Sequence, residues 1–327
     1  MNRFQIYIQL TLVSLISIIL IVVDIDTINR DGVFYLMQAK MFLDGNYDKA
    51  LDFYRVPFFS SLIALFSYLT NVSIFYSAHI INFIFFIISI FYFYKTLQLV
   101  SKSKIPLYFA TIIILASPLI DDYMIMILRD HGYWAFFMMG VYYFVKWIDN
   151  LKLNFFYGWN FAFIFGALFR PESLIVFIFL HLFLIFHLRK NQLFIKVVRQ
   201  IFFLFLIISL FCILLFAFAN IPIYDLGVLT KINLYFKIFI NNIFGNLDIH
   251  SDDVLLDLLL VDFTKSFKHI FFLYVSLYKW VVGLGVFYLF LLYIALKNNL
   301  VKEKFKPILF SFLAITFVLT FINLYLY

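Results

Sequence analysis

The sequence is poor in charged residues and in the residues that interrupt helices. Only 13% of its 327 residues are Asp, Glu, Lys or Arg, and it has 10 glycines and 6 prolines. By contrast, 65% of the residues are hydrophobic, and the mean hydropathy is +1.01. So little polar surface excludes a globular protein that folds in water. The single cysteine, Cys212, lies in an apolar run, which excludes an intramolecular disulfide and predicts an inert, packed thiol.

Long apolar runs dominate the chain instead. A run of about 20 residues can cross the hydrocarbon core of a bilayer as a helix. The sequence therefore predicts an all-α, polytopic integral membrane protein with about nine transmembrane helices. The expected spans are residues 5–23, 74–94, 106–120, 132–148, 154–169, 173–188, 200–219, 280–296 and 307–326.

Two further apolar segments, 57–70 and 264–279, have the wrong length or too many polar residues for a span. We expect them to be juxtamembrane helices that lie in or dip into the interface. All four tryptophans fall at the ends of predicted spans, which is typical of an aromatic belt at the membrane surface. They are Trp134, Trp147, Trp159 and Trp280.

The distribution of charge predicts the orientation. The loops on one side of this topology hold 14 bases and two acids, whereas the other side holds 11 bases and 16 acids. The positive-inside rule then places the N-terminus in the cytoplasm and the acidic side outside the cytoplasmic (inner) membrane. The net charge of +7 does not indicate a nucleic-acid partner, because the bases fall in short loops between spans. The membrane itself is the expected partner.

The densest charge lies directly after the first predicted span, where residues 24–55 contain six acids and four bases. Carboxylates are costly near lipid, so a cluster kept at the water boundary indicates a chemical role. Residues 31–43 have the pattern of an amphipathic helix that Gly45 ends, with Asp31 and Tyr35 stacked on one face. Asp31 is therefore a candidate catalytic base. The structural alternative is that Asp31 only caps this helix.

A second charged group, Arg129-Asp130-His131, lies where the third predicted span meets the fourth. His131 beside a carboxylate could ligate a divalent cation, and ordinary interfacial charge is the structural alternative. A third group, Arg170-Pro171-Glu172, joins the fifth and sixth spans. Pro171 can open a helix whose positive end Glu172 complements, but this leaves Arg170 unexplained. Its planar guanidinium could hold a lipid-linked phosphate through two hydrogen bonds.

These residues resemble the GT-C superfamily of membrane glycosyltransferases, particularly its protein-mannosyltransferase and aminoarabinose-transferase branch. In that family an outward loop after the first span carries an Asp four residues before an aromatic residue, and a Tyr-Arg-x-Pro-like segment follows. Here Asp31-Gly-Val-Phe-Tyr35 and Tyr54-Arg55-Val56-Pro57 occur in that order, and Asp130 corresponds to a second acid in the next outward loop. The resemblance covers residues 1–190. It departs at Gly32, where the family often has Glu.

The resemblance implies one membrane domain, 1–327, with a catalytic core in 1–190 and C-terminal spans in 191–327. It implies inverting transfer of a sugar from a polyprenyl-phosphate donor to a lipid or surface-glycan acceptor on the outer (periplasmic) face. Asp31 and Asp130 would be catalytic, and Asp130 with His131 would be the candidate metal pair. The candidate substrate-binding residues are Tyr35, Tyr54, Arg55, Arg129, His131, Arg170 and Glu172.

Two other classes of function stay open. A lipid-linked glycan polymerase or ligase would place its key site in the late loop, 220–262, where Asp248, His250, Asp252 and Asp253 could touch a sugar or a metal. A solvated acidic loop is the structural alternative there. A transporter or lipid flippase is the other class. No predicted span has a charged residue near its centre or a central proline, which argues against ion-coupled transport.

Overall fold

The computed structural model describes residues 3–54, 57–101, 105–115, 118–170 and 172–188, with short stretches at 195, 198–199, 201, 301, 303–307, 309–310 and 313–314. These described residues form helices and contain no strand, so the predicted all-α class is confirmed for them. The chain divides into two compact units, Met1–Leu180 and His181–Tyr327. The predicted spans 200–219 and 280–296, the segment 264–279 and the loop 220–262 lie outside the described residues, as does most of 307–326.

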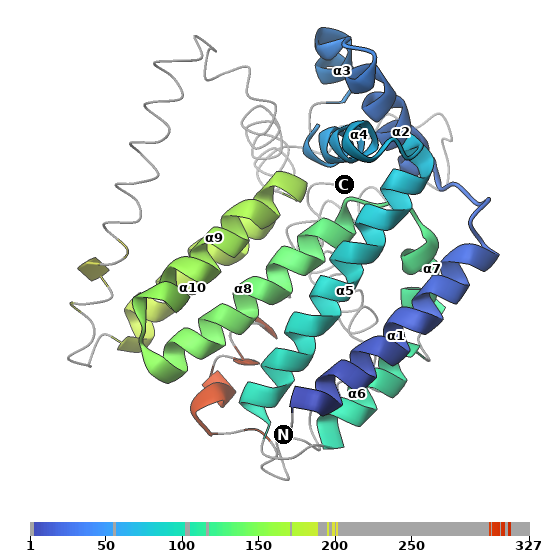
Figure 1. The fold of residues 1–327 in the computed structure, drawn as a ribbon. Helices are drawn as coiled ribbons and strands as arrows, with labels where there is room; N and C mark the ends of the chain where they lie inside the picture. The colour runs from blue at the N-terminus through green and yellow to red at the C-terminus, as the bar shows by residue number, and fades with distance from the viewer. Residues whose placement is uncertain are drawn as a thin grey trace, which may run out of the picture. The chain divides into compact units, whose positions relative to one another are not determined.

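Ten α-helices follow one another along the described part of the chain (Figure 1). They are α1 Arg3–Val23, α2 Arg30–Leu43, α3 Tyr47–Phe53, α4 Phe58–Thr70, α5 Ile74–Val100, α6 Ile105–Leu115, α7 Pro118–Ile125, α8 Asp130–Asn150, α9 Leu153–Phe169 and α10 Glu172–Leu188. In the first unit α1, α5, α8 and α9 lie side by side, and the shorter helices α2, α3 and α4 lie at one end of this row. That end carries the candidate site.

Two helices are long and apolar enough to cross a membrane among the residues described, Phe4–Val23 in α1 and Ile74–Val100 in α5. At 1.5 Å per residue, their 20 and 27 residues span about 30 Å and 40 Å, against a hydrocarbon core of about 30 Å. Four shorter helices are also apolar: Phe58–Thr70, Pro106–Leu115, Leu153–Phe169 and Glu172–Ile185. Length and composition alone would therefore allow α1 and α5 to cross a membrane.

The predicted span 106–120 is helical where it is described. The structure has α6 up to Leu115 and α7 from Pro118, and residues 116–117 between them lie outside the described residues. The amphipathic helix expected over 31–43 is observed as α2. It ends as predicted, because Gly45 adopts a φ of +73° that a residue with a side chain rarely adopts.

The aromatic-belt prediction is wrong for Trp147 and Trp159. Both side chains are fully buried, at 1% and 0% exposure, where α8 packs against α9. The ring of Trp159 makes an edge contact with Phe144 at 5.3 Å, and Trp147 contacts Phe156 at 5.6 Å. Close approach of the two helices is made possible by Gly140, where a Cβ would lie only 2.8 Å from the Phe163 ring. The indoles therefore build the core of the first unit.

Candidate functional site

Three segments that are far apart in the sequence meet at one end of the first unit. They are the beginning of α2, the turn of residues 126–129 before α8, and the junction between α9 and α10. Hydrogen bonds join the first segment to the second, and an ion pair joins the beginning of α8 to the third. The acids and bases on which the sequence prediction rests therefore share one neighbourhood.

The beginning of α2 is tied to the turn before α8 by Asn29. Its side-chain Oδ1 accepts a hydrogen bond from the Ile127 N–H at 2.9 Å, and its Nδ2 donates to the Ile127 carbonyl at 3.3 Å. Asn29 occupies the N-cap position of α2, although its side chain makes no capping hydrogen bond. Asp31 is two residues further on, exposed in the first helical turn. Asn29 rather than Asp31 therefore holds the N-cap position, and Asp31 places a negative charge in the first turn of α2.

Gly32 explains how α2 approaches this turn so closely. A Cβ at position 32 would lie 2.7 Å from Asn29 Oδ1 and 3.1 Å from Ile127 Cβ. A larger side chain would therefore crowd both Ile127 and the Asn29 oxygen that accepts the Ile127 N–H, and would disturb these hydrogen bonds. Gly32 is thus required by packing, because α2 lies against Ile127 at this position.

A second asparagine holds the same turn from the other side. Asn82, which is buried in α5, donates from Nδ2 to the Met126 carbonyl at 3.0 Å. Two amide side chains from different helices therefore fix the backbone just before Arg129 and Asp130. Sequence analysis missed both Asn29 and Asn82. An isolated asparagine in an apolar helix such as α5 was a usable signal, because a polar group inside such a helix needs a partner.

Asp130 and Arg170 form an ion pair across the site, with 2.6 Å between Arg170 Nε and Asp130 Oδ1. Glu172 lies on the other side of the same guanidinium, 3.9 Å from Nη1. The side chains are half-buried, with 15% of Asp130 and 36% of Arg170 exposed. Burial lowers the pKa of Arg170, but its attraction to Asp130 and Glu172 more than offsets this, so the pKa is raised. Arg170 stays protonated, and two carboxylates share its charge.

Arg129 has a different environment. Its guanidinium carbon lies over the Tyr54 ring, 5.8 Å from the ring centroid, a cation–π arrangement. Its Nη1 is buried and has no hydrogen-bond partner among the described residues. A buried guanidinium nitrogen without an acceptor costs free energy that an incoming anion would recover. Arg129 is therefore better suited than Arg170 to receive a phosphate.

Tyr35 lines the same region from α2. Its ring is 4% exposed and makes edge contacts with Tyr54 at 6.0 Å and with Phe59 at 5.2 Å. Burial raises the pKa of the Tyr35 hydroxyl, although the nearby Arg129 guanidinium opposes the rise. The phenol is therefore neutral at physiological pH and acts as a hydrogen-bonding group. Asp31 also lies within electrostatic range of this hydroxyl.

The structure separates the two members of the candidate metal pair. Asp130 faces Arg170, whereas His131 is 1% exposed and lies inside the first unit. The His131 ring pairs through Nδ1 with the Leu128 carbonyl at 3.2 Å and makes an edge contact with Trp134. Within the described ranges, no three His, Cys, Asp or Glu side chains are placed to hold a metal ion. Arg55 and the acids of the 220–262 loop lie outside the described residues.

Comparison of the chain with protein-family models, with curated proteins and with solved structures gives no match. The functional argument therefore depends on the site's own residues and geometry.

Proposed function

We propose that the chain is a polytopic membrane protein with about nine spans and a cytoplasmic N-terminus, and that it is an inverting glycosyltransferase. It moves a sugar from a polyprenyl-phosphate donor to a lipid or surface-glycan acceptor at the outer face of the cytoplasmic membrane. The observation that carries this proposal is the Asn29–Ile127 pair of hydrogen bonds. Through it, the helix that bears the exposed Asp31 carboxylate is held to the turn that bears Arg129, whose buried Nη1 has no hydrogen-bond partner within the described residues.

The two groups suit the two halves of the reaction. The acceptor hydroxyl attacks the anomeric carbon while a carboxylate, assigned to Asp31, takes its proton. The bond between that carbon and the phosphate oxygen breaks, and the phosphate leaves with the bonding electrons and a negative charge. Arg129 takes up this charge, because its Nη1 has a free donor and Tyr54 holds the guanidinium plane. This differs from the sequence-based expectation, which gave the phosphate to Arg170.

Arg170 and Asp130 act here as positioning residues. Asp130 is the first residue of α8 and directly follows Arg129, so its ion pair with Arg170 anchors the turn to the α9–α10 junction. Tyr35, with its neutral hydroxyl, and Tyr54 form the wall beside Arg129. No step of the proposed reaction is assigned to a divalent cation, because Asp130 already has a cationic partner.

The deciding experiment compares Asp31→Asn with Asp48→Asn. Both aspartates are exposed and lie in the first turn of a helix, Asp31 in α2 and Asp48 in α3, so both substitutions remove the same kind of helix-end charge. Only Asp31 is assigned the proton transfer. We expect Asp31→Asn to lower the transfer rate by at least ~10²-fold, the lower end for loss of a general base, and Asp48→Asn to stay near wild type.

The assay measures transfer from polyprenyl-phosphate sugars in membranes that contain equal amounts of each variant. Mass spectrometry of surface glycolipids identifies the product, and the thermal midpoint in detergent checks the fold. A stable Asp31→Asn variant with wild-type transfer would remove the central residue of the proposal. The lipid-linked glycan polymerase and the flippase would then be the functions to test.

Arg129 and Arg170 are separated by lysine substitutions. Arg129→Lys keeps the charge but loses the planar face that lies over Tyr54, so we expect a raised KM for the lipid-phosphate donor. Arg170→Lys keeps a cation between Asp130 and Glu172, so its main effect should be on stability. Steady-state kinetics with varied donor concentration distinguish the two. A larger change in donor KM for Arg170→Lys would return the phosphate to Arg170.

A further inference from the structure

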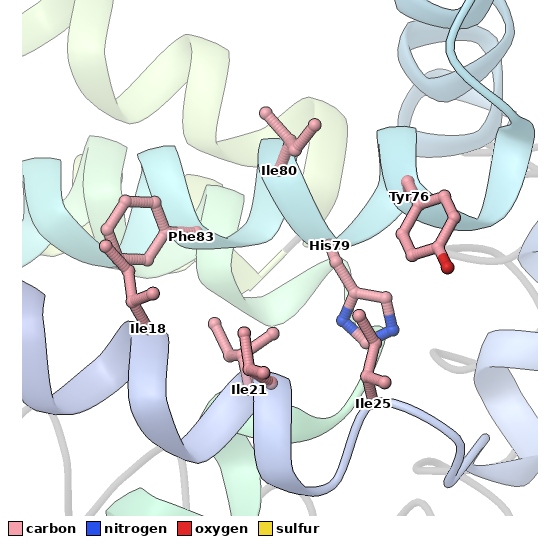
Figure 2. Close-up of a pocket in the computed structure, with 8 residues that line it drawn as sticks. Ile18, Ile21, Ile25, Tyr76, His79, Ile80 and Phe83 are labelled. Carbon is pink, nitrogen blue, oxygen red and sulfur yellow. The ribbon is translucent and has the colours of Figure 1, made fainter.

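An apolar cavity of about 380 Å³, open at the surface of the first unit, lies between α1 and α5, the two described helices long enough to cross a membrane. The helices run in opposite directions along it, so that Ile18 lies beside Phe83 and Ile25 lies beside His79 (Figure 2). Its volume is at the lower end of the range typical of small-molecule sites, about 300–1,000 Å³. The wall is almost wholly hydrocarbon and carries no formal charge apart from the titratable His79.

His79 is the unusual residue of this wall. It is 5% exposed, and its ring reaches from α5 toward the end of α1 between Ile21 and Ile25 (Figure 2). Its Nε2 has no hydrogen-bond partner among the described residues. A buried polar nitrogen without a partner costs about 1–3 kcal/mol, so a ligand that supplies an uncharged hydrogen-bonding group would be favoured there.

The depth of His79 along α5 indicates what that group is. It lies five positions after Ile74, the first residue of α5, which places it about 7.5 Å from the helix end. A 27-residue helix is about 40 Å long and exceeds a hydrocarbon core of about 30 Å by about 5 Å at each end. His79 would then lie where the headgroups of a bilayer meet its hydrocarbon, the level of the ester carbonyls of glycerophospholipids. Ile18 and Phe83 lie deeper, at the level of the acyl chain.

We propose that this cavity binds one ester-linked acyl chain of a membrane glycerophospholipid, with the ester carbonyl hydrogen-bonded to His79 and the chain against Ile18 and Phe83. This inference rests on the membrane location proposed above and not on glycosyl transfer. The lack of a fixed cation in the wall suits a neutral ester and disfavours a lipid phosphate, which would need an arginine or a lysine. The site is thus separate from the one assigned to the phosphate of the sugar donor.

The test uses the full-length protein, delipidated in mild detergent and offered an equimolar mixture of diester and diether phosphatidylethanolamine with matched chains. Native mass spectrometry measures the ratio of the two lipids on the protein. Because the ether lacks a carbonyl, we expect the wild type to favour the diester by about twofold to tenfold, which corresponds to one net hydrogen bond. His79→Phe keeps an aromatic ring and should abolish the preference, and His79→Gln, with a neutral hydrogen-bonding side chain, should restore it.

A matched pair of variants tests the cavity itself. Ile18→Trp should fill the cavity and remove the most tightly bound lipid, whereas Ile19→Trp, at a 60% exposed neighbour that does not line the cavity, should leave it in place. Equal binding of diester and diether by the wild type would overturn the proposal, and so would undiminished binding by a folded Ile18→Trp variant. Displacement of the diester by an equal concentration of polyprenyl phosphate would assign the cavity to the sugar donor and would also refute it.

Discussion

Arg170 bridges two carboxylates, and this predicts an unequal response to the loss of each partner. Replacing Arg170 with methionine keeps most of the side chain's hydrocarbon but leaves Asp130 and Glu172 without their shared cation. Replacing Asp130 with asparagine leaves Arg170 with Glu172, which is still 3.9 Å from Nη1. Replacing Glu172 with glutamine leaves the short 2.6 Å contact with Asp130 intact. We therefore expect the loss of stability to decrease in the order Arg170→Met, Asp130→Asn, Glu172→Gln.

The expected magnitudes follow from the burial of the pair. Exposed ion pairs contribute about 0.2–1 kcal/mol, and removing one partner of a buried pair costs about 3–5 kcal/mol. With Asp130 15% and Arg170 36% exposed, this pair lies between the two cases. We expect a cost of about 2–3 kcal/mol for Arg170→Met, about 1–2 kcal/mol for Asp130→Asn and under about 1 kcal/mol for Glu172→Gln. The Arg170→Met/Asp130→Asn double variant should lose less than the sum of the single losses, because the two side chains interact directly.

Thermal unfolding of the purified variants in one detergent measures this order. One kcal/mol corresponds to roughly 2–4 °C in domains of 150–250 residues, so the first two variants should differ from the wild type by several degrees. The Asp48→Asn variant controls for the loss of an exposed carboxylate. A double variant whose loss equals the sum of the single losses would show that Asp130 and Arg170 are not coupled. Glu172→Gln as the most damaging change would refute the bridging geometry.

Three further predictions concern packing, pH and topology. Gly132→Ala should destabilise the protein and weaken transfer, because a Cβ there would overlap the ring of Phe169; unchanged thermal stability and transfer would contradict this contact. Burial raises the pKa of Tyr35 in the folded protein, so above pH 10 its hydroxyl ionises more readily in the unfolded chain. The contribution of the Tyr35 hydroxyl to folding stability is therefore fully present below pH 10 and is lost as the pH rises further. Wild-type protein should thus lose stability more steeply above pH 10 than Tyr35→Phe, and parallel curves would argue against it. In a background without the native cysteine, a membrane-impermeant thiol reagent applied to whole cells should label a cysteine at Asp48 but not one at Lys152, and the reverse pattern would invert the topology.

Most of the local structure could be predicted because it depends on residues close together in the chain. The apolar runs predicted the helices α1, α5, α8, α9 and α10. The pattern of residues 31–43, followed by Gly45, predicted α2 and the point where it ends. The seven-residue helix α3 was missed, because so short a helix has no clear periodicity.

The sequence did not show which residues each side chain would contact in the folded protein. Trp147 and Trp159 fit an aromatic belt by position, yet the packing of α8 on α9 buries both. Asp31 fits a helix cap by type, yet Asn29 occupies that position and bonds to Ile127 instead. In each case the residue type allows two environments, and a contact with another segment of the chain decides between them.

Composition and local pattern are enough to establish that this chain is helical and strongly apolar, and they single out the acids and arginines that interrupt the apolar runs. Tertiary packing selects Arg170 as the partner of Asp130 and leaves Arg129 Nη1 buried with no hydrogen-bond partner among the described residues. The physical reason is one of range. Helix formation and hydropathy depend on neighbours within a few turns, whereas an ion pair forms only where the backbone brings both charges within a few ångströms.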